Sequence, residues 1–153
     1  MTRHKYIEWF DAEEMHEHSK EWFSELSFIK DEQQFLTSLI TSFATKPLDK
    51  KAFKQLDDFK KSIAESQYRL ISIFKQVQKH MNQLEIIIDD VNQLEMEKAY
   101  RVSHKNLFQI VNEYLLDFRT IKQRGFSKLK HLLAENKKIA LNNPEYKLKT
   151  TKT

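Results

Sequence analysis

The chain has 153 residues, with one glycine, two prolines, no cysteine and a formal net charge of +4. The absence of cysteine excludes disulfides, thiol catalysis and zinc–thiolate sites. No apolar run approaches the ~18 residues of a membrane-spanning helix. Because loops need glycine and proline, their scarcity predicts a few long elements. Residues 1–10 carry Glu8 and lack the apolar core of a signal peptide, and we expect a cytoplasmic protein with no membrane span.

The first predicted helix covers residues 12–45. Asp11 followed by Glu14 is a capping-box pattern, and Pro47 disfavours helical geometry in the residue before it. The apolar stripe between these signals consists of Met15, Trp22, Leu26, Ile29, Leu36, Ile40 and Phe43, widened by Phe28, Phe35 and Leu39. A stripe of this width is typical of a helix that touches two neighbours.

The second predicted helix covers residues 50–88, with Asp49 as its N-cap. It carries a long heptad seam, in which ten of twelve positions are hydrophobic. The seam consists of Phe53, Leu56, Lys60, Ile63, Gln67, Leu70, Phe74, Val77, Met81, Leu84, Ile88 and Val91. We interpret Lys60 and Gln67, together with Gln33 in the first helix, as polar breaks that specify register and pairing.

The third predicted helix covers residues 94–136. Its apolar stripe consists of Tyr100, His104, Leu107, Val111, Tyr114, Phe118, Ile121, Leu129 and Leu132. Gly125 falls in this stripe, where it would permit a close helix approach or a kink. Asn142-Asn143-Pro144 ends any helix.

A turn over residues 89–94, with Asp90 or Asn92 as a cap, would separate the second helix from the third. The first two helices would be roughly 50 and 58 Å long, and such matched lengths favour an antiparallel hairpin. The sequence therefore predicts an all-α, up-down-up bundle of three long antiparallel helices with coiled-coil-like packing. The alternative is one unbroken helix over residues 50–136. We expect a single domain over residues 1–140 and a flexible basic tail over 141–153.

Residues within the first helix resemble a known kind of protein. The similarity is carried by His18, Trp22, Glu25-Leu26, Phe28 and Lys30-Asp31-Glu32. This stretch resembles the opening helix of small, uncharacterised bacterial helical proteins. The resemblance covers about one helix and implies a helical bundle in a bacterial, intracellular setting, without implying any activity.

Histidines and carboxylates give the bundle one candidate metal site. The predicted arrangement brings His18, His80 and His104 to one level, where Glu21 or Glu25 could complete a ligand set. Bundle metal sites typically use a glutamate three residues before each histidine, and none of these three histidines has one. One histidine per helix is more often a hydrogen-bonded core residue. We therefore predict no bound metal and no cofactor.

The charges along the chain are unevenly distributed. Residues 7–32 hold nine acids and two lysines, whereas residues 119–153 hold ten bases and two acids. In the bundle, a basic patch would form at the end that holds Pro47, from Lys46, Lys50, Lys51, Lys54, Lys128, Lys130, Lys137 and Lys138. Such a patch could bind the phosphates of nucleic acid or of anionic lipid. The alternative is that acidic starts and basic ends complement the helix dipoles.

No Ser-His-Asp set, phosphate-binding loop or paired-carboxylate signature stands out in the chain. The sequence therefore favours a non-enzymatic interaction or structural module. Its abundant aromatic residues favour self-association, as a dimer, or binding to another protein. The alternatives are a metal- or cofactor-binding bundle and a nucleic-acid-associated protein that uses the basic patch.

Overall fold

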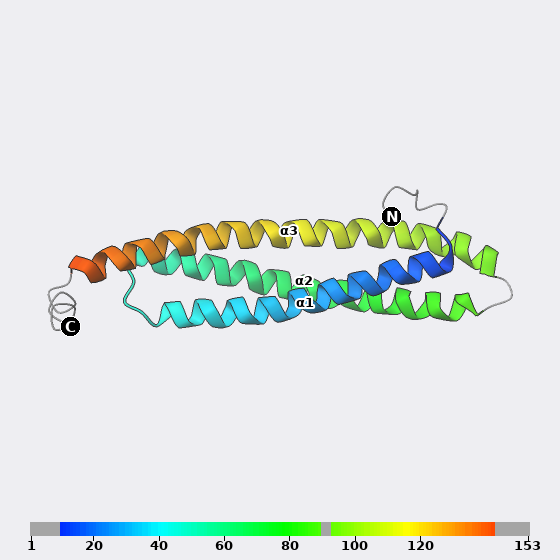
Figure 1. The fold of residues 1–153 in the computed structure, drawn as a ribbon, viewed down its shortest axis with the longest axis horizontal. Coiled ribbons are helices and arrows are strands. Elements are labelled where there is room, and N and C mark those ends of the chain that lie inside the picture. Colours follow the sequence, from blue (N-terminus) through cyan, green and yellow to red (C-terminus); the bar gives the residue numbers. More distant parts are fainter. Residues whose placement is uncertain (1–9, 90–92, 143–153) are drawn as a thin grey trace.

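The computed structural model describes residues 10–89 and 93–142; for Gln93 and residues 136–142 it describes the backbone alone. Within this part of the chain the fold is three long helices and no strand: α1 (Ala12–Ala44), α2 (Lys50–Ile88) and α3 (Gln93–Asn142). The helices run up, down and up along a common axis, so that α1 and α3 are parallel and α2 is antiparallel to both (Figure 1). The predicted all-α three-helix bundle is confirmed.

Local sequence signals fix the helix starts. Asp11 Oδ1 accepts a hydrogen bond from the backbone N–H of Glu14 at 2.8 Å, at the start of α1. Asp49 Oδ1 accepts one from the N–H of Ala52 at 2.7 Å, at the start of α2. Each carboxylate satisfies an N–H group that the first helical turn leaves without a partner. Both predicted caps are confirmed.

The second turn separates α2 from α3. Helix α2 ends at Ile88 and α3 begins at Gln93, so the alternative of one unbroken helix is wrong. The candidate caps Asp90 and Asn92 lie outside the described residues. Helix α3 continues to Asn142, six residues beyond its predicted end, and the remainder of the predicted basic tail also lies outside the described residues.

The buried residues of α2 repeat every seven residues, with two in each heptad. The predicted seam has one of these two residues right and places the other one residue too far along the chain. The buried residues are Ala52, Leu56, Phe59, Ile63, Ser66, Leu70, Ile73, Val77, His80, Leu84 and Ile87. Each predicted seam residue from Phe53 to Ile88 that is absent from this list directly follows a buried residue, and its side chain is exposed or half-buried. Phe74, for example, packs beside the core against Phe23 of α1, with ring centroids 4.6 Å apart. A helix with two partners has apolar flanks, so periodicity alone could not separate core from flank.

Gly125 allows α2 and α3 to approach closely, as the sequence predicts. A Cβ atom at this position would lie 2.2 Å from the ring of Phe59. The Phe59 side chain is buried in the core, and it occupies the space that any other residue at position 125 would fill. Over the described residues, no helix is both long and apolar enough to cross a membrane.

Candidate functional site

One histidine from each helix meets in a single layer near the start of α1. His80 Nε2 and His104 Nδ1 are 2.9 Å apart, and His104 Nε2 and His18 Nδ1 are 3.5 Å apart. His104 is fully buried and uses both ring nitrogens. Since a neutral imidazole donates from one nitrogen and accepts at the other, the three rings form a hydrogen-bonded chain with a single direction.

Aromatic rings enclose this histidine layer. Trp22 stacks on His104 with ring centroids 4.7 Å apart, and Phe10 meets His18 edge-on at 4.8 Å. Closer to the starts of α1 and α3, buried Glu97 accepts a hydrogen bond from the N–H of Ala12 at 2.9 Å. These contacts place Phe10 and Trp22 in the core at the acidic end, and they join the start of α1 to α3.

Both buried histidines are neutral at pH 7. Burial lowers the pKa of His80 to about 4. Burial, with the neighbouring imidazoles of His80 and His18, lowers the pKa of His104 to about 3. Moving a charged imidazolium from water into an apolar layer is costly, so burial favours the neutral rings. The nitrogens of the neutral rings then hydrogen-bond to one another.

The structure brings together three of the five candidate metal ligands. Glu21 and Glu25 are exposed on α1 and do not enter the layer. The two nitrogens of His104 point to different partners and not to one common point. Among the described residues no group of three or more histidine, aspartate or glutamate side chains is arranged to hold a metal ion. One Glu-x-x-His spacing does occur in α1, from Glu13 to His16, but it lies on a different side of the helix from His18.

A second polar layer lies further along the core, again with one residue from each helix. Gln33 Nε2 donates to Ser66 Oγ at 3.0 Å and to the Tyr114 hydroxyl oxygen at 2.8 Å. The Tyr114 hydroxyl donates to the carbonyl of Ser66 at 2.8 Å. All three side chains are buried, so this polar layer supports the interpretation of Gln33 as a register-specifying residue.

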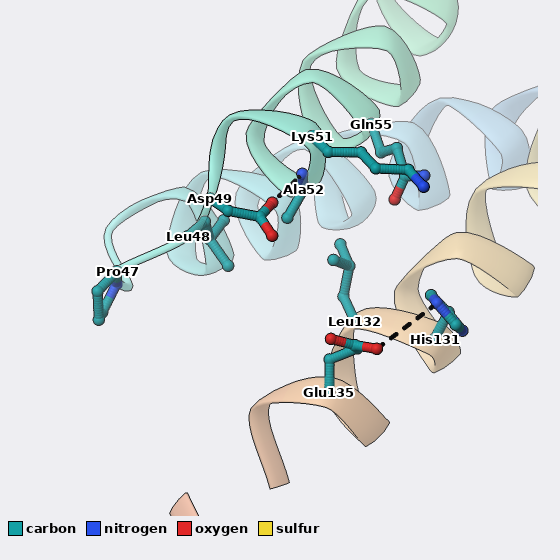
Figure 2. Close-up of a pocket in the computed structure, with 9 residues that line it drawn as sticks. All are labelled: Pro47, Leu48, Asp49, Lys51, Ala52, Gln55, His131, Leu132 and Glu135. Atoms are coloured by element: carbon teal, nitrogen blue, oxygen red, sulfur yellow. Dashed lines mark hydrogen bonds and ion pairs between the residues drawn. The ribbon is translucent and has the colours of Figure 1, made fainter. Parts of the chain in front are cut away.

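The candidate basic patch is only partly assembled. Lys46, Lys50, Lys51, Lys54 and Lys130 are exposed and Lys128 is half-buried, whereas the side chains of Lys137 and Lys138 lie outside the described residues. Figure 2 shows the hollow at this end, where Lys51 and Asp49 from the start of α2 face His131 and Glu135 from α3. Two carboxylates therefore line the same hollow as the lysine and weaken its attraction for phosphate.

The side of the bundle shared by α1 and α3 exposes aromatic residues that the apolar stripe predicts to contact a neighbouring helix. Phe28 is 67% exposed and Phe35 is 65% exposed, and the two lie seven residues apart on one face of α1. Phe28 lines a shallow apolar groove with Leu115 of α3. One ion pair joins the two helices beside it, from Lys122 Nζ to Glu32 Oε1 at 2.7 Å. We call this surface the α1–α3 face.

The two polar layers and the α1–α3 face differ in what they can bind. The histidine layer and the Gln33 layer bond their polar groups largely within the core, whereas the α1–α3 face leaves large rings in water. Neither Phe28 nor Phe35 was a predicted site residue, because the continuous apolar stripe of α1 does not show which of its edges is exposed.

No family model matches the chain, and neither a curated protein nor a solved structure is significantly similar to it.

Proposed function

We propose that this protein is a non-enzymatic helical-bundle module that acts by binding another protein chain through the α1–α3 face. The observation that carries the proposal is the pair Phe28 and Phe35, two large rings left two-thirds exposed on one helix face. Covering a phenylalanine side chain stabilises a complex by roughly 1.5–3 kcal/mol. Aromatic residues grouped on one surface are typical of binding sites.

The interior supports the same reading. Its buried imidazoles hydrogen-bond to one another, and its buried amide and hydroxyl groups form a layer that fixes register. Such groups specify one arrangement of three helices, which gives the outer face a fixed shape. We place the module in a bacterial cytoplasm, which the resemblance of residues 18–36 favours.

The native size of the protein in a gentle cell extract tests this function. We expect the wild-type chain to elute well above its monomer mass of 18.4 kDa, and Phe28→Ser/Phe35→Ser to elute as a monomer. Tyr68→Ser is the matched control, because Tyr68 is 79% exposed on α2 and away from the α1–α3 face. Monomeric elution of the wild-type chain, or an unchanged complex in the double variant, would contradict the proposal.

A second candidate function is nucleic-acid binding at the basic patch. It is favoured by Lys51, Lys128 and Lys130, which border neighbouring hollows at the end that holds Pro47. Binding through phosphates should weaken steeply as salt rises. A titration of mixed DNA and RNA with the purified protein, at low and at physiological salt, tests this candidate. Absence of binding at low salt would exclude it.

A further inference from the structure

The charges around the α1–α3 face point to its occupant. Resting on the proposed function, we propose that the occupant is a second copy of this chain. The two copies are related by a two-fold axis parallel to the bundle, so that α1 of each copy packs against α3 of the other. The copies would bury Phe28 and Phe35 of both chains in a shared apolar strip.

On α1 the positions that flank the exposed rings are acidic. His18 and Glu32 contact α3, whereas Phe23 contacts α2, and these contacts orient the helix. The positions on the α3 side and the outer edge carry Glu14, Glu17, Glu21, Glu25, Asp31 and Glu32 and no lysine or arginine. The only lysines of α1, Lys20 and Lys30, fall outside these positions.

On α3 the corresponding positions are basic. Phe108 contacts Trp22 and Lys122 contacts Glu32, so both residues mark the side of α3 that faces α1. This side and the outer edge, from residue 96 to residue 126, carry Lys98, Arg101, Lys105, Arg119 and Lys122 and no acid. The acids of α3 in this range lie elsewhere. Glu97 is buried, Glu113 lies on the side of the helix opposite Lys122, and Asp117 pairs with Arg69 of α2 at 3.2 Å.

This segregation exceeds what the contact between α1 and α3 within one chain requires. Glu21, Asp31, Lys105 and Arg119 are all exposed, at positions turned outward from the ion pair of Glu32 and Lys122. An acidic strip beside a basic strip, with apolar side chains between them, is complementary to its own two-fold copy.

The symmetry axis follows from the parallel run of α1 and α3 (Figure 1). Rotation about an axis along the bundle keeps every residue at its own level and sets acidic α1 against basic α3. Leu116, which is 61% exposed beside Leu115, then lies at the level of the partner copy's Phe28. Rotation about a perpendicular axis would instead set acid against acid, and like charges oppose such pairing.

A charge-exchange experiment tests this dimer. The α1 variant is Glu21→Lys/Asp31→Lys, and the α3 variant is Lys105→Glu/Arg119→Glu. Either variant alone places like charges across both halves of the interface, so we expect its dimerisation to weaken about tenfold or more at low salt. An equimolar mixture should restore a heterodimer, because each charged strip again meets its opposite. Sedimentation of each variant and of the mixture gives the masses, and circular dichroism checks that both remain folded.

The outcomes separate this inference from the proposed function. Purified wild-type protein that stays monomeric at high micromolar concentration overturns the second copy as occupant. If its large complex in extract is nevertheless lost in Phe28→Ser/Phe35→Ser, the interaction function stands with a different partner. A dimer that neither charge variant weakens, or a mixture that fails to restore association, overturns the two-fold arrangement.

Discussion

Two layers of the core are built from polar side chains, one from each helix, yet protons affect them differently. In the layer of Gln33, Ser66 and Tyr114 the Gln33 amide and the Tyr114 hydroxyl each donate to defined acceptors, and burial raises the pKa of Tyr114 above its usual value near 10. That layer keeps one protonation state at any ordinary pH. The histidine layer can accept protons within the physiological range once the chain unfolds, so its contribution to stability depends on pH.

Equal burial of the two layers does not give them an equal response to pH. The neutral amide–hydroxyl layer selects one register of three helices at any ordinary pH. The histidine layer selects a register too, since His104 must meet both neighbours, but only while its rings stay uncharged.

Acid should produce the largest effect. His80 and His104 have folded-state pKa values of about 4 and about 3, below the value of about 6.5 in the unfolded chain. Below pH 6.5 the unfolded state therefore binds more protons than the folded state, and the free energy of unfolding falls as pH falls. Between pH 7 and pH 5 we expect a loss of roughly 3–4 kcal/mol from the two rings together, measured by urea denaturation at each pH.

The control for the acid effect is His131→Gln, because the His131 side chain is exposed on α3. That variant should lose as much stability between pH 7 and pH 5 as the wild-type chain. If the wild-type chain has the same free energy of unfolding at both pH values, the folded-state pKa values of His80 and His104 are not lowered, which would contradict the prediction.

Truncating a single hydroxyl in the other layer should have a smaller effect that is independent of pH. Tyr114→Phe removes an acceptor from Gln33 and a donor from the carbonyl of Ser66. We expect the free energy of unfolding to fall by roughly 1–3 kcal/mol, by the same amount at pH 7 and pH 8. Tyr68→Phe, on the exposed side of α2, should change it by no more than about 0.5 kcal/mol. A loss that differs between the two pH values would contradict the distinction between the layers.

The sequence predicts much of the fold because its signals are local. Asp11 and Asp49 cap the helices they precede, and the predicted limits of α2 are those observed. The choice between Ile73 and Phe74 could not be made, because both are apolar and the choice depends on where α1 lies.

The candidate site could be predicted only in part. Matching helix lengths place the three histidines at one level, but the direction of each ring nitrogen depends on packing by Trp22 and Phe10. For the same reason Glu21 and Glu25 share a helix side with His18 without reaching the layer. The exposure of Phe28 and Phe35 was hidden, because a wide apolar stripe has the same pattern whether a second helix covers its edge or not.

In the interior the three histidines bond to one another, and we expect them to hold no ion, which leaves binding to the outer face. Nitrogen-15 NMR of the imidazole rings between pH 8 and pH 6, with and without added zinc, tests it most directly. We predict that His80 and His104 stay neutral throughout this range, with ring-nitrogen shifts that zinc does not change. An imidazolium signal from either ring at pH 6 to 7, or a stoichiometric zinc-induced shift of all three rings, would contradict the claim.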